Sequence, residues 1–291
     1  MLGNFKKMKR ILGYLFVLCV AWSCQYDFEV SSPVQEDRMF VECIAGLDED
    51  NKSFLSLRRC TPIGKPAVSG ANYSLESLRL NSNGEQMDYS RVIKEGDPFV
   101  SFAFDEAFNP GDVLDLNVVV QGMPELNAKT IVPPIPSSTI SMEDAGGRLI
   151  VRIRLDGFVD DNAGFAFTCV DPETDSPYDI TSDSDDESLT SMLSSRLKIV
   201  YYGDKRLCIF RGADLNNAEY VFVMGKQTAK YKITLMSLSE EAYGYLNAKY
   251  NQENNYLGML GLSPPNFAYS NISGGYGVLG AVSKVSKTFE F

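Results

Sequence analysis

Short runs in which apolar and polar residues alternate recur along most of this chain, and they constrain its fold more than any other feature. In residues 148–155, "RLIVRIRL", apolar residues fall at every second position and two arginines lie between them. A period of two places successive side chains on opposite faces of a β-strand. The sequence therefore predicts an all-β fold. Comparable runs occupy residues 39–46, 53–60, 98–104, 113–120, 164–170, 196–202, 206–212, 219–225 and 230–238.

Turn and proline signals divide these predicted strands into two groups. Asn83-Gly84 is a strong signal for a short hairpin turn. Residues 133–136, "PPIP", end the first group, since proline cannot donate to the ladder of a central strand. We predict two β-sandwich or barrel-like domains. The first, residues 38–135, is immunoglobulin- or transthyretin-like, and the second, residues 136–291, is β-rich and carries one short helix.

One segment departs from the strand period. Ser237 and Glu240 match the spacing of a helical capping box, and Ala242 and Tyr245 then begin a helical spacing of apolar residues. The polar run "NQENN" at residues 251–255 ends the pattern. We expect this helix to pack its apolar face against a core.

A glycine-rich stretch near the end of the chain, residues 270–281, has the Gly-x-Gly-x-x-Gly spacing of dinucleotide-binding loops at Gly275, Gly277 and Gly280. That fingerprint has meaning only when a helix follows the glycines within a βαβ unit. The residues that follow, "AVSKVSKTFEF", alternate as a strand does. We therefore predict a passage between strands in which glycine permits bends and close backbone approach, and no phosphate-binding loop.

The N-terminus has the pattern of a bacterial lipoprotein signal. Four cations in residues 6–10 precede the apolar run 11–21, which is shorter than the ~20 apolar residues that a membrane span requires. The sequence "AWSC" that ends the run resembles a lipobox. We predict a signal peptide at residues 1–23, acylation of Cys24 as a membrane anchor, and an acidic tether at residues 24–37. Ordinary cleavage without a lipid is the alternative.

Composition narrows the functional classes. The chain has no histidine, which excludes a Ser-His-Asp triad, a Cys-His pair and an HExxH zinc site. No other arrangement of residues points to catalysis, so we predict no enzymatic activity and no cofactor. The formal net charge of −11 disfavours nucleic acid as a partner.

Two groups of residues are candidate sites within the predicted mature chain. Cys169 and Cys208 lie in predicted strands of the second domain, and a disulfide between them is favoured over other pairings of the cysteines. Free, buried thiols are the alternative, and both remain open. Four closely spaced acids offer oxygen ligands for Ca²⁺, although a solvated loop is favoured because the spacing is not that of an EF-hand. These acids are Asp183, Asp185, Asp186 and Glu187.

Three stretches together resemble a known family. The first is "CQYDFEV" at residues 24–30, and the second is the segment 109–136, which contains a proline-glycine turn, two predicted strands and then prolines. The third is the segment 238–283, which contains the predicted helix, a proline pair, "YSNI" and "GGYGVLGA". The sequence resembles the outer-membrane lipoproteins of Bacteroidota grouped as domain-of-unknown-function family 4249. The resemblance covers essentially the whole mature chain and supplies no catalytic residues.

The resemblance implies an accessory lipoprotein of a SusC-like, TonB-dependent transporter, anchored in the outer membrane and exposed at the cell surface. The favoured hypothesis is therefore a non-enzymatic binding module that has a TonB-dependent outer-membrane receptor as its partner. The alternative is a structural surface protein, such as a fimbrial or adhesin subunit, which would assemble by strand addition.

Overall fold

The computed structural model describes residues 38–48, 52–60, 73–92, 100–105, 107–157, 159–181, 198–215, 219–255 and 269–291. The predicted signal peptide, Cys24 and the tether lie outside these residues. So do the four acids at positions 183, 185, 186 and 187.

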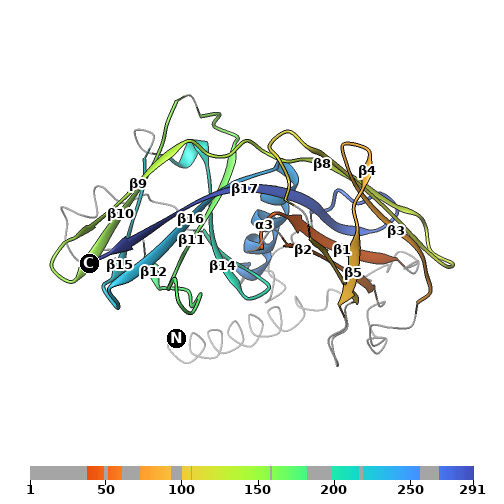
Figure 1. Ribbon diagram of the computed structural model, residues 1–291, viewed down its shortest axis with the longest axis horizontal. Helices are drawn as coiled ribbons and strands as arrows, with labels where there is room; N and C mark the ends of the chain where they lie inside the picture. The colour runs from red at the N-terminus through yellow and green to blue at the C-terminus, as the bar shows by residue number, and fades with distance from the viewer. Residues whose placement is uncertain are drawn as a thin grey trace, which may run out of the picture. The chain divides into compact units, whose positions relative to one another are not determined.

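Three sheets account for the described strands (Figure 1). The longest has the order β13 (Lys198–Tyr202), β14 (Lys205–Arg211), β11 (Gly164–Val170), β16 (Lys230–Leu238), β17 (Tyr276–Glu290), β1 (Met39–Ala45), β2 (Lys52–Arg59), β6 (Val100–Asp105) and β5 (Tyr89–Val92). A second has the order β12 (Ile180–Thr181), β15 (Glu219–Gly225), β10 (Arg148–Leu155) and β9 (Ser138–Asp144). The third has the order β4 (Glu85–Gln86), β3 (Leu75–Ser82), β7 (Val113–Val120) and β8 (Leu126–Ile131).

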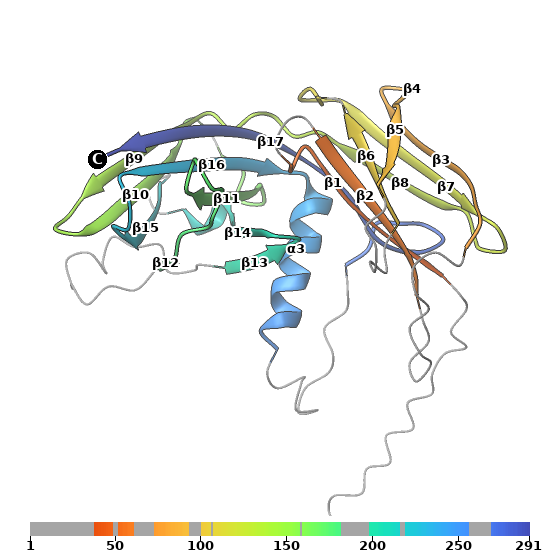
Figure 2. The ribbon, with the colours of Figure 1, turned by 60° about the horizontal axis from the view of Figure 1, so that its bottom comes forward.

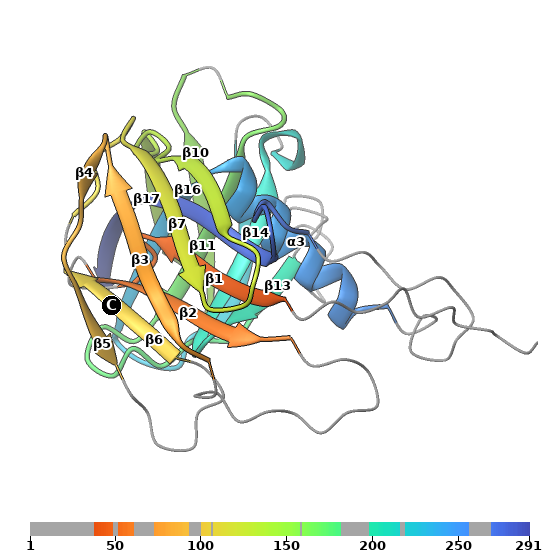
Figure 3. The ribbon, with the colours of Figure 1, turned by 90° about the vertical axis from the view of Figure 1, so that its right-hand side faces the viewer.

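Each small sheet packs on one half of the long sheet, which gives two β-sandwiches. In the N-terminal sandwich, β3 and β7 lie beside β1 and β2 (Figure 3), and the strictly alternating burial of β7 directs every second side chain into the shared core. In the C-terminal sandwich, β10 and β15 cover β11, β14 and β16. The core there is aromatic, with Phe167 stacked on Phe222 at a ring distance of 4.5 Å. The predicted all-β sandwich architecture is confirmed.

β17 joins the two sandwiches. Its first half, Tyr276 to Ala281, pairs in parallel with β1, and its second half, from Val282, pairs antiparallel with β16. Figure 1 shows this strand running from the β1–β2 region to the side of β9. The side chains of Leu279 and Ala281 enter the N-terminal core, whereas Val278 and Val282 face the helix.

The predicted division at residues 133–136 lies between β8 and β9, but hydrogen bonding crosses it. The Ser283 hydroxyl of β17 donates to Pro133 O at 2.6 Å, and the shared strand itself belongs to both halves. Asp37–Phe291 forms one compact unit. The predicted domains 38–135 and 136–291 therefore contain most of each sandwich but do not separate the sheet that they share.

The predicted helix is α3 (Glu240–Glu253), which packs on the face of the long sheet opposite the sandwich cores. Figure 2 shows it beside β13, β14 and β1. Its N-cap is Ser239, and the predicted capping box at Ser237 is wrong, because Ser237 is still a β16 residue paired with Ser283.

A short 3-10 helix, η1 (Gly212–Asp214), follows β14. Among the described residues, no helix has the length and apolar character needed to cross a membrane.

The glycine-rich stretch was predicted to be a passage between strands, but Gly277 and Gly280 lie within β17 itself, where they allow close packing. Gly277 has a φ of +117°, and a Cβ there would collide with the backbone of Val41 on β1. A Cβ on Gly280 would lie 2.8 Å from the Cβ of Ala242 in α3. The spacing that resembles a nucleotide fingerprint therefore marks close approaches of β17 to β1 and to α3.

The contact between Gly280 and α3 predicts a large effect of one methyl group. Gly280→Ala forces α3 away from β17 and should lower the free energy of unfolding by about 1–3 kcal/mol, the cost of overpacking a core. Gly225→Ala is the matched control, because a Cβ at that strand residue has nothing within 4 Å. Urea denaturation of both variants measures the difference. Equal stability of the two would show that α3 is not closely packed on Gly280.

Candidate functional site

The candidate site is a pocket of about 350 Å³ on the long sheet. Thr168 and Thr234 face it, and both alternate with residues that enter the C-terminal core, so the pocket lies on the same face as α3. Strands β11, β16 and β17 form the floor. The walls come from the residues after β1, the turn after β11 and the β13–β14 turn.

A row of hydroxyl groups crosses the floor. The registers place Thr168 opposite Thr234 and Thr234 opposite Ser286. Thr234 Oγ1 and Ser286 Oγ are 2.8 Å apart and hydrogen-bonded. Lys232 and Lys284 each lie two residues from this row on their own strands, so both project from the same face of the sheet. The floor therefore presents hydroxyls between two ammonium groups.

The β13–β14 turn supplies the next wall and further positive charge. Lys205 Nζ lies 3.6 Å from Asp48 Oδ1, and each of these side chains is 26% exposed. The backbone carbonyl of Asp48 also accepts a hydrogen bond from Lys284 Nζ. Burial raises the pKa of the Asp48 carboxyl, and the Lys205 and Lys284 ammonium groups oppose that rise. The segment after β1 is thus attached to both the wall and the floor.

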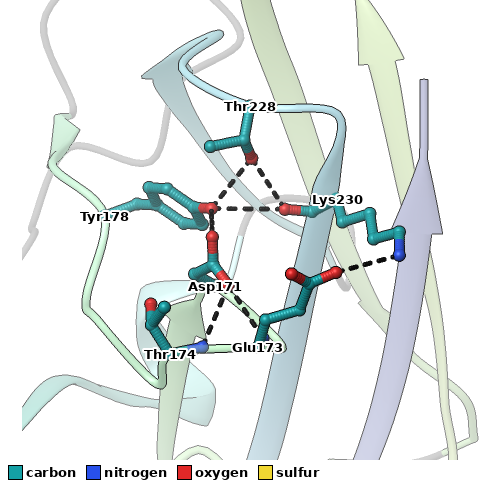
Figure 4. Close-up of polar contacts among 6 residues, drawn as sticks. All are labelled: Asp171, Glu173, Thr174, Tyr178, Thr228 and Lys230. Atoms are coloured by element: carbon teal, nitrogen blue, oxygen red, sulfur yellow. Dashed lines mark hydrogen bonds and ion pairs between the residues drawn. The ribbon is translucent and has the colours of Figure 1, made fainter.

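The turn after β11 is held by the polar network in Figure 4. The Tyr178 hydroxyl lies 3.1 Å from Asp171 Oδ2 and 2.9 Å from Thr228 Oγ1. Asp171 Oδ1 accepts from the backbone N–H groups of Glu173 at 2.8 Å and Thr174 at 3.1 Å. These backbone bonds and the Tyr178 hydroxyl lower the pKa of Asp171, the Glu173 bond most strongly. The network fixes the turn whose residues Asp175 and Pro177 line the pocket.

Arg206 connects the two walls. Its Nη1 donates to Tyr178 O at 3.1 Å and to Asp179 Oδ1 at 2.7 Å. Its Nε is buried and has no hydrogen-bond partner among the described residues. The side chain is only 14% exposed, so the position of its guanidinium is set by the protein and not by solvent.

The pocket combines charged groups of both signs. Its lining contains four cations, Lys205, Arg206, Lys232 and Lys284, and two acids, Asp175 and Asp204. Two further acids beside it, Asp48 and Asp179, pair with Lys205 and Arg206. The arrangement can therefore form hydrogen bonds to a polar ligand through its hydroxyls and its charged side chains.

A second hollow lies at the N-terminus of α3, beside Pro133 and Pro134, with a volume of about 1000 Å³. Two of its polar side chains bind each other, because Thr130 Oγ1 donates to Glu241 Oε2 at 2.8 Å. It brings together fewer charged groups than the pocket on the sheet, which we take as the candidate site.

The predicted disulfide is not formed: Cys169 and Cys208 are free thiols. The register places Cys208 opposite Phe167, and Cys169 lies two residues further along β11. Such diagonal neighbours are about 7–8 Å apart, whereas a disulfide needs Cα atoms within about 7 Å. Both thiols are buried, and burial raises the pKa of Cys169 to about 12. Buried free thiols, the alternative, describe both residues.

The other predicted site residues lie outside the described part of the chain. They are Cys24 and the calcium candidates Asp183, Asp185, Asp186 and Glu187. Within the part that the structure describes, no group of three or more acidic or cysteine side chains is placed to hold a metal ion. Sequence reasoning missed the pocket, although lysine and hydroxyl side chains recur in "KYKIT" and "SKVSK" at strand positions that alternate with core residues.

The chain is similar to the chicken interferon gamma receptor alpha chain, with 9% identity, a TM-score of 0.22 and coverage of 69% of this chain and 89% of that chain. It is also similar to a marsupial T cell receptor, with 9% identity, a TM-score of 0.26 and coverage of 70% and 67%. No curated protein matches. A family model described as a domain of unknown function (DUF4249) matches residues 25–288, so the chain belongs to the DUF4249 family.

Proposed function

We propose that this protein is a non-enzymatic binding module, held at the outer membrane of a Bacteroidota cell by a lipid on Cys24, that assists a TonB-dependent nutrient transporter. The observation that carries the binding role is the pocket on the long sheet, which is lined by charged and hydroxyl-bearing side chains. Its volume of about 350 Å³ lies within the usual range for small-molecule sites. The signal-like N-terminus and the resemblance of the sequence support the location and the partner.

The construction of the pocket also supports binding. Its floor consists of three neighbouring strands of a continuous sheet, and Arg206 and the Tyr178 network fix its walls. Sites on rigid elements hold their donors in place before the ligand arrives, which lowers the entropy cost of binding. A receptor that delivers a ligand to a transporter benefits from this property.

The alternative, a fimbrial or adhesin subunit, needs a strand that can be exchanged between subunits. The first described strand, β1, is hydrogen-bonded on both sides, to β2 and to β17. Its side chains Met39, Val41 and Cys43 are fully buried in the N-terminal core. Removing this strand would open that core, so the accessory role is the better supported of the two.

The anchor is tested by Cys24→Ala. Acyl chains contribute about 0.8 kcal/mol per buried CH₂ group, and stable anchoring depends on them. The variant should move from the membrane pellet to the soluble fraction. Cys60→Ala, which removes a half-buried thiol in the described chain, should leave the protein in the pellet. If Cys24→Ala still sediments after a salt wash, the anchor lies elsewhere.

The partner is tested by purification of the lipid-anchored protein in mild detergent from the cells that produce it. We expect a large TonB-dependent β-barrel to co-purify. Exposed aromatic residues are the expected contacts, since interfaces favour them, and Tyr201 and Tyr276 are 54% and 52% exposed. Recovery of the protein alone would count against the accessory role. A ladder of self-multimers would support the adhesin alternative.

A further inference from the structure

We propose that the protein has a second ligand site, the linker cavity, which binds a small organic cation with an apolar body, such as an aromatic amine. The linker cavity lies between residues 133–137, which connect β8 to β9, and the connection from β10 to β11. Its volume is about 330 Å³, and it shares no lining residue with the pocket on the long sheet. The inference goes beyond the proposed function and does not depend on it.

The floor of the linker cavity is apolar. Leu155 and Phe165, which belong to the C-terminal core, line it and are only 3% and 7% exposed. The Phe165 ring is held in place by stacking on Phe210 at a ring distance of 5.3 Å. Leu238 at the end of β16 continues this apolar surface. A ring or a branched alkyl group that covers these side chains removes apolar surface from water, which favours binding.

Both walls of the linker cavity are fixed by the protein itself. Three of residues 133–137 are prolines, whose rings restrict φ to about −65°, and Pro133 O accepts a hydrogen bond from the Ser283 hydroxyl at 2.6 Å. On the opposite wall the Ala163 N–H donates to Asp160 O at 2.9 Å, and the Ala163 carbonyl accepts from the first residue of η1 at 2.9 Å. A cavity held in this way loses little conformational entropy when a ligand binds.

The charge of the linker cavity is negative. Asp156 and Asp160 line it, and the described residues of its lining include no lysine or arginine. Asp156 Oδ2 accepts from Ser137 Oγ at 3.4 Å, and Asp160 Oδ1 accepts from the Asn162 N–H at 2.8 Å. Within the part of the chain that the structure describes, neither carboxylate forms an ion pair. An ionised carboxylate has about four acceptor positions, so both can still accept from an ammonium group.

The charged groups on the adjoining elements leave this negative charge in place. The cation on β14, Arg211, donates to Asn162 O, and its guanidinium carbon lies 3.9 Å from the centroid of the Tyr243 ring. Two further acids, Asp161 beside Asn162 and Asp214 in η1, outweigh this single cation. A concave surface of one charge sign attracts ligands of the opposite sign. An amine is therefore favoured over a neutral or an anionic ligand of the same shape.

Calorimetric titration with three probes of similar size tests the charge preference. They are 2-phenylethylamine, which is a cation, 2-phenylethanol, which is neutral, and 3-phenylpropionate, which is an anion. The protein is the chain from residue 24, which contains the whole compact unit Asp37–Phe291. We expect the amine to bind about threefold to tenfold more tightly than the alcohol, the gain from two exposed carboxylates. The propionate should bind more weakly than the alcohol, and added salt should reduce the advantage of the amine.

Ethylamine tests the apolar floor, because it keeps the charge of 2-phenylethylamine and lacks its ring. Burying an aromatic ring contributes enough free energy that ethylamine should bind at least about tenfold more weakly.

Asp160→Asn tests whether the acid at the wall selects the cation. The substitution keeps an oxygen that can accept from the Asn162 N–H but removes the charge. It should weaken binding of the amine about twofold to fivefold and leave binding of the alcohol unchanged. Asp105→Asn is the matched control, since it makes the same change at an exposed acid of β6 and should leave the binding of both probes unchanged.

Ile135→Ala tests the proline wall. Ile135 lines the linker cavity and is 56% exposed, so the variant should fold as the parent does. It should weaken binding of both the amine and the alcohol at least about threefold, because both lose apolar contact. Ile131→Ala is the matched control: Ile131 is 58% exposed and lines the hollow at the N-terminus of α3 instead. A thermal melt of each variant confirms that it is folded.

The inference is overturned if the parent protein binds none of the probes, or if the alcohol or the propionate binds as tightly as the amine. Amine binding that is unchanged by both Asp160→Asn and Ile135→Ala would place the ligand elsewhere and would also overturn it. So would a control variant that weakens binding as much as its counterpart. Co-purification with a transporter tests the proposed function separately, so either result can stand without the other.

Discussion

The exchange of partners along β17 is the constraint on which the rest of the structure depends. Up to Ala281 the strand runs parallel to β1, and from Val282 it runs antiparallel to β16. A parallel pair needs a crossover connection, and here the crossover is nearly the whole chain between β1 and β17. One strand thereby aligns the two sandwiches and carries Lys284 and Ser286 to the floor of the pocket.

The helix and the glycines follow from this exchange. β16 ends at Leu238, and Ser239 continues its pairing: the Ser239 N–H donates to Ala281 O at 2.9 Å, and the Ala281 N–H donates to Ser239 Oγ at 3.2 Å. The same Ser239 hydroxyl caps α3. Because α3 begins against β17, Gly280 must lack a side chain where Ala242 rests. A segment that resembles a nucleotide-binding loop is therefore a packing motif.

Local features of this fold could be predicted from the sequence, because local chemistry decides them. The Asn83-Gly84 hairpin turn forms with φ values of 53° and 88°. The alternation of apolar and polar residues in 148–155 correctly predicts strand β10. The helix cap was misplaced by two residues, because Ser237 and Ser239 have the same chemistry and only the β17 ladder distinguishes them. The pocket was missed because Lys232 and Lys284 become neighbours only through the β16–β17 register, which sequence periodicity does not encode.

The most direct test of this account follows the unfolding of each sandwich separately. Expressed without its predicted signal peptide, the chain has no tryptophan, since Trp22 is its only one. Tyr89→Trp reports on the N-terminal sandwich, where the ring contacts Phe102, and Phe291→Trp reports on the C-terminal sandwich, where it contacts Tyr231. If β17 couples the two, both fluorescence transitions in urea should coincide with the loss of strand signal in circular dichroism. Two transitions at different urea concentrations, each removing part of the strand signal, would contradict the account.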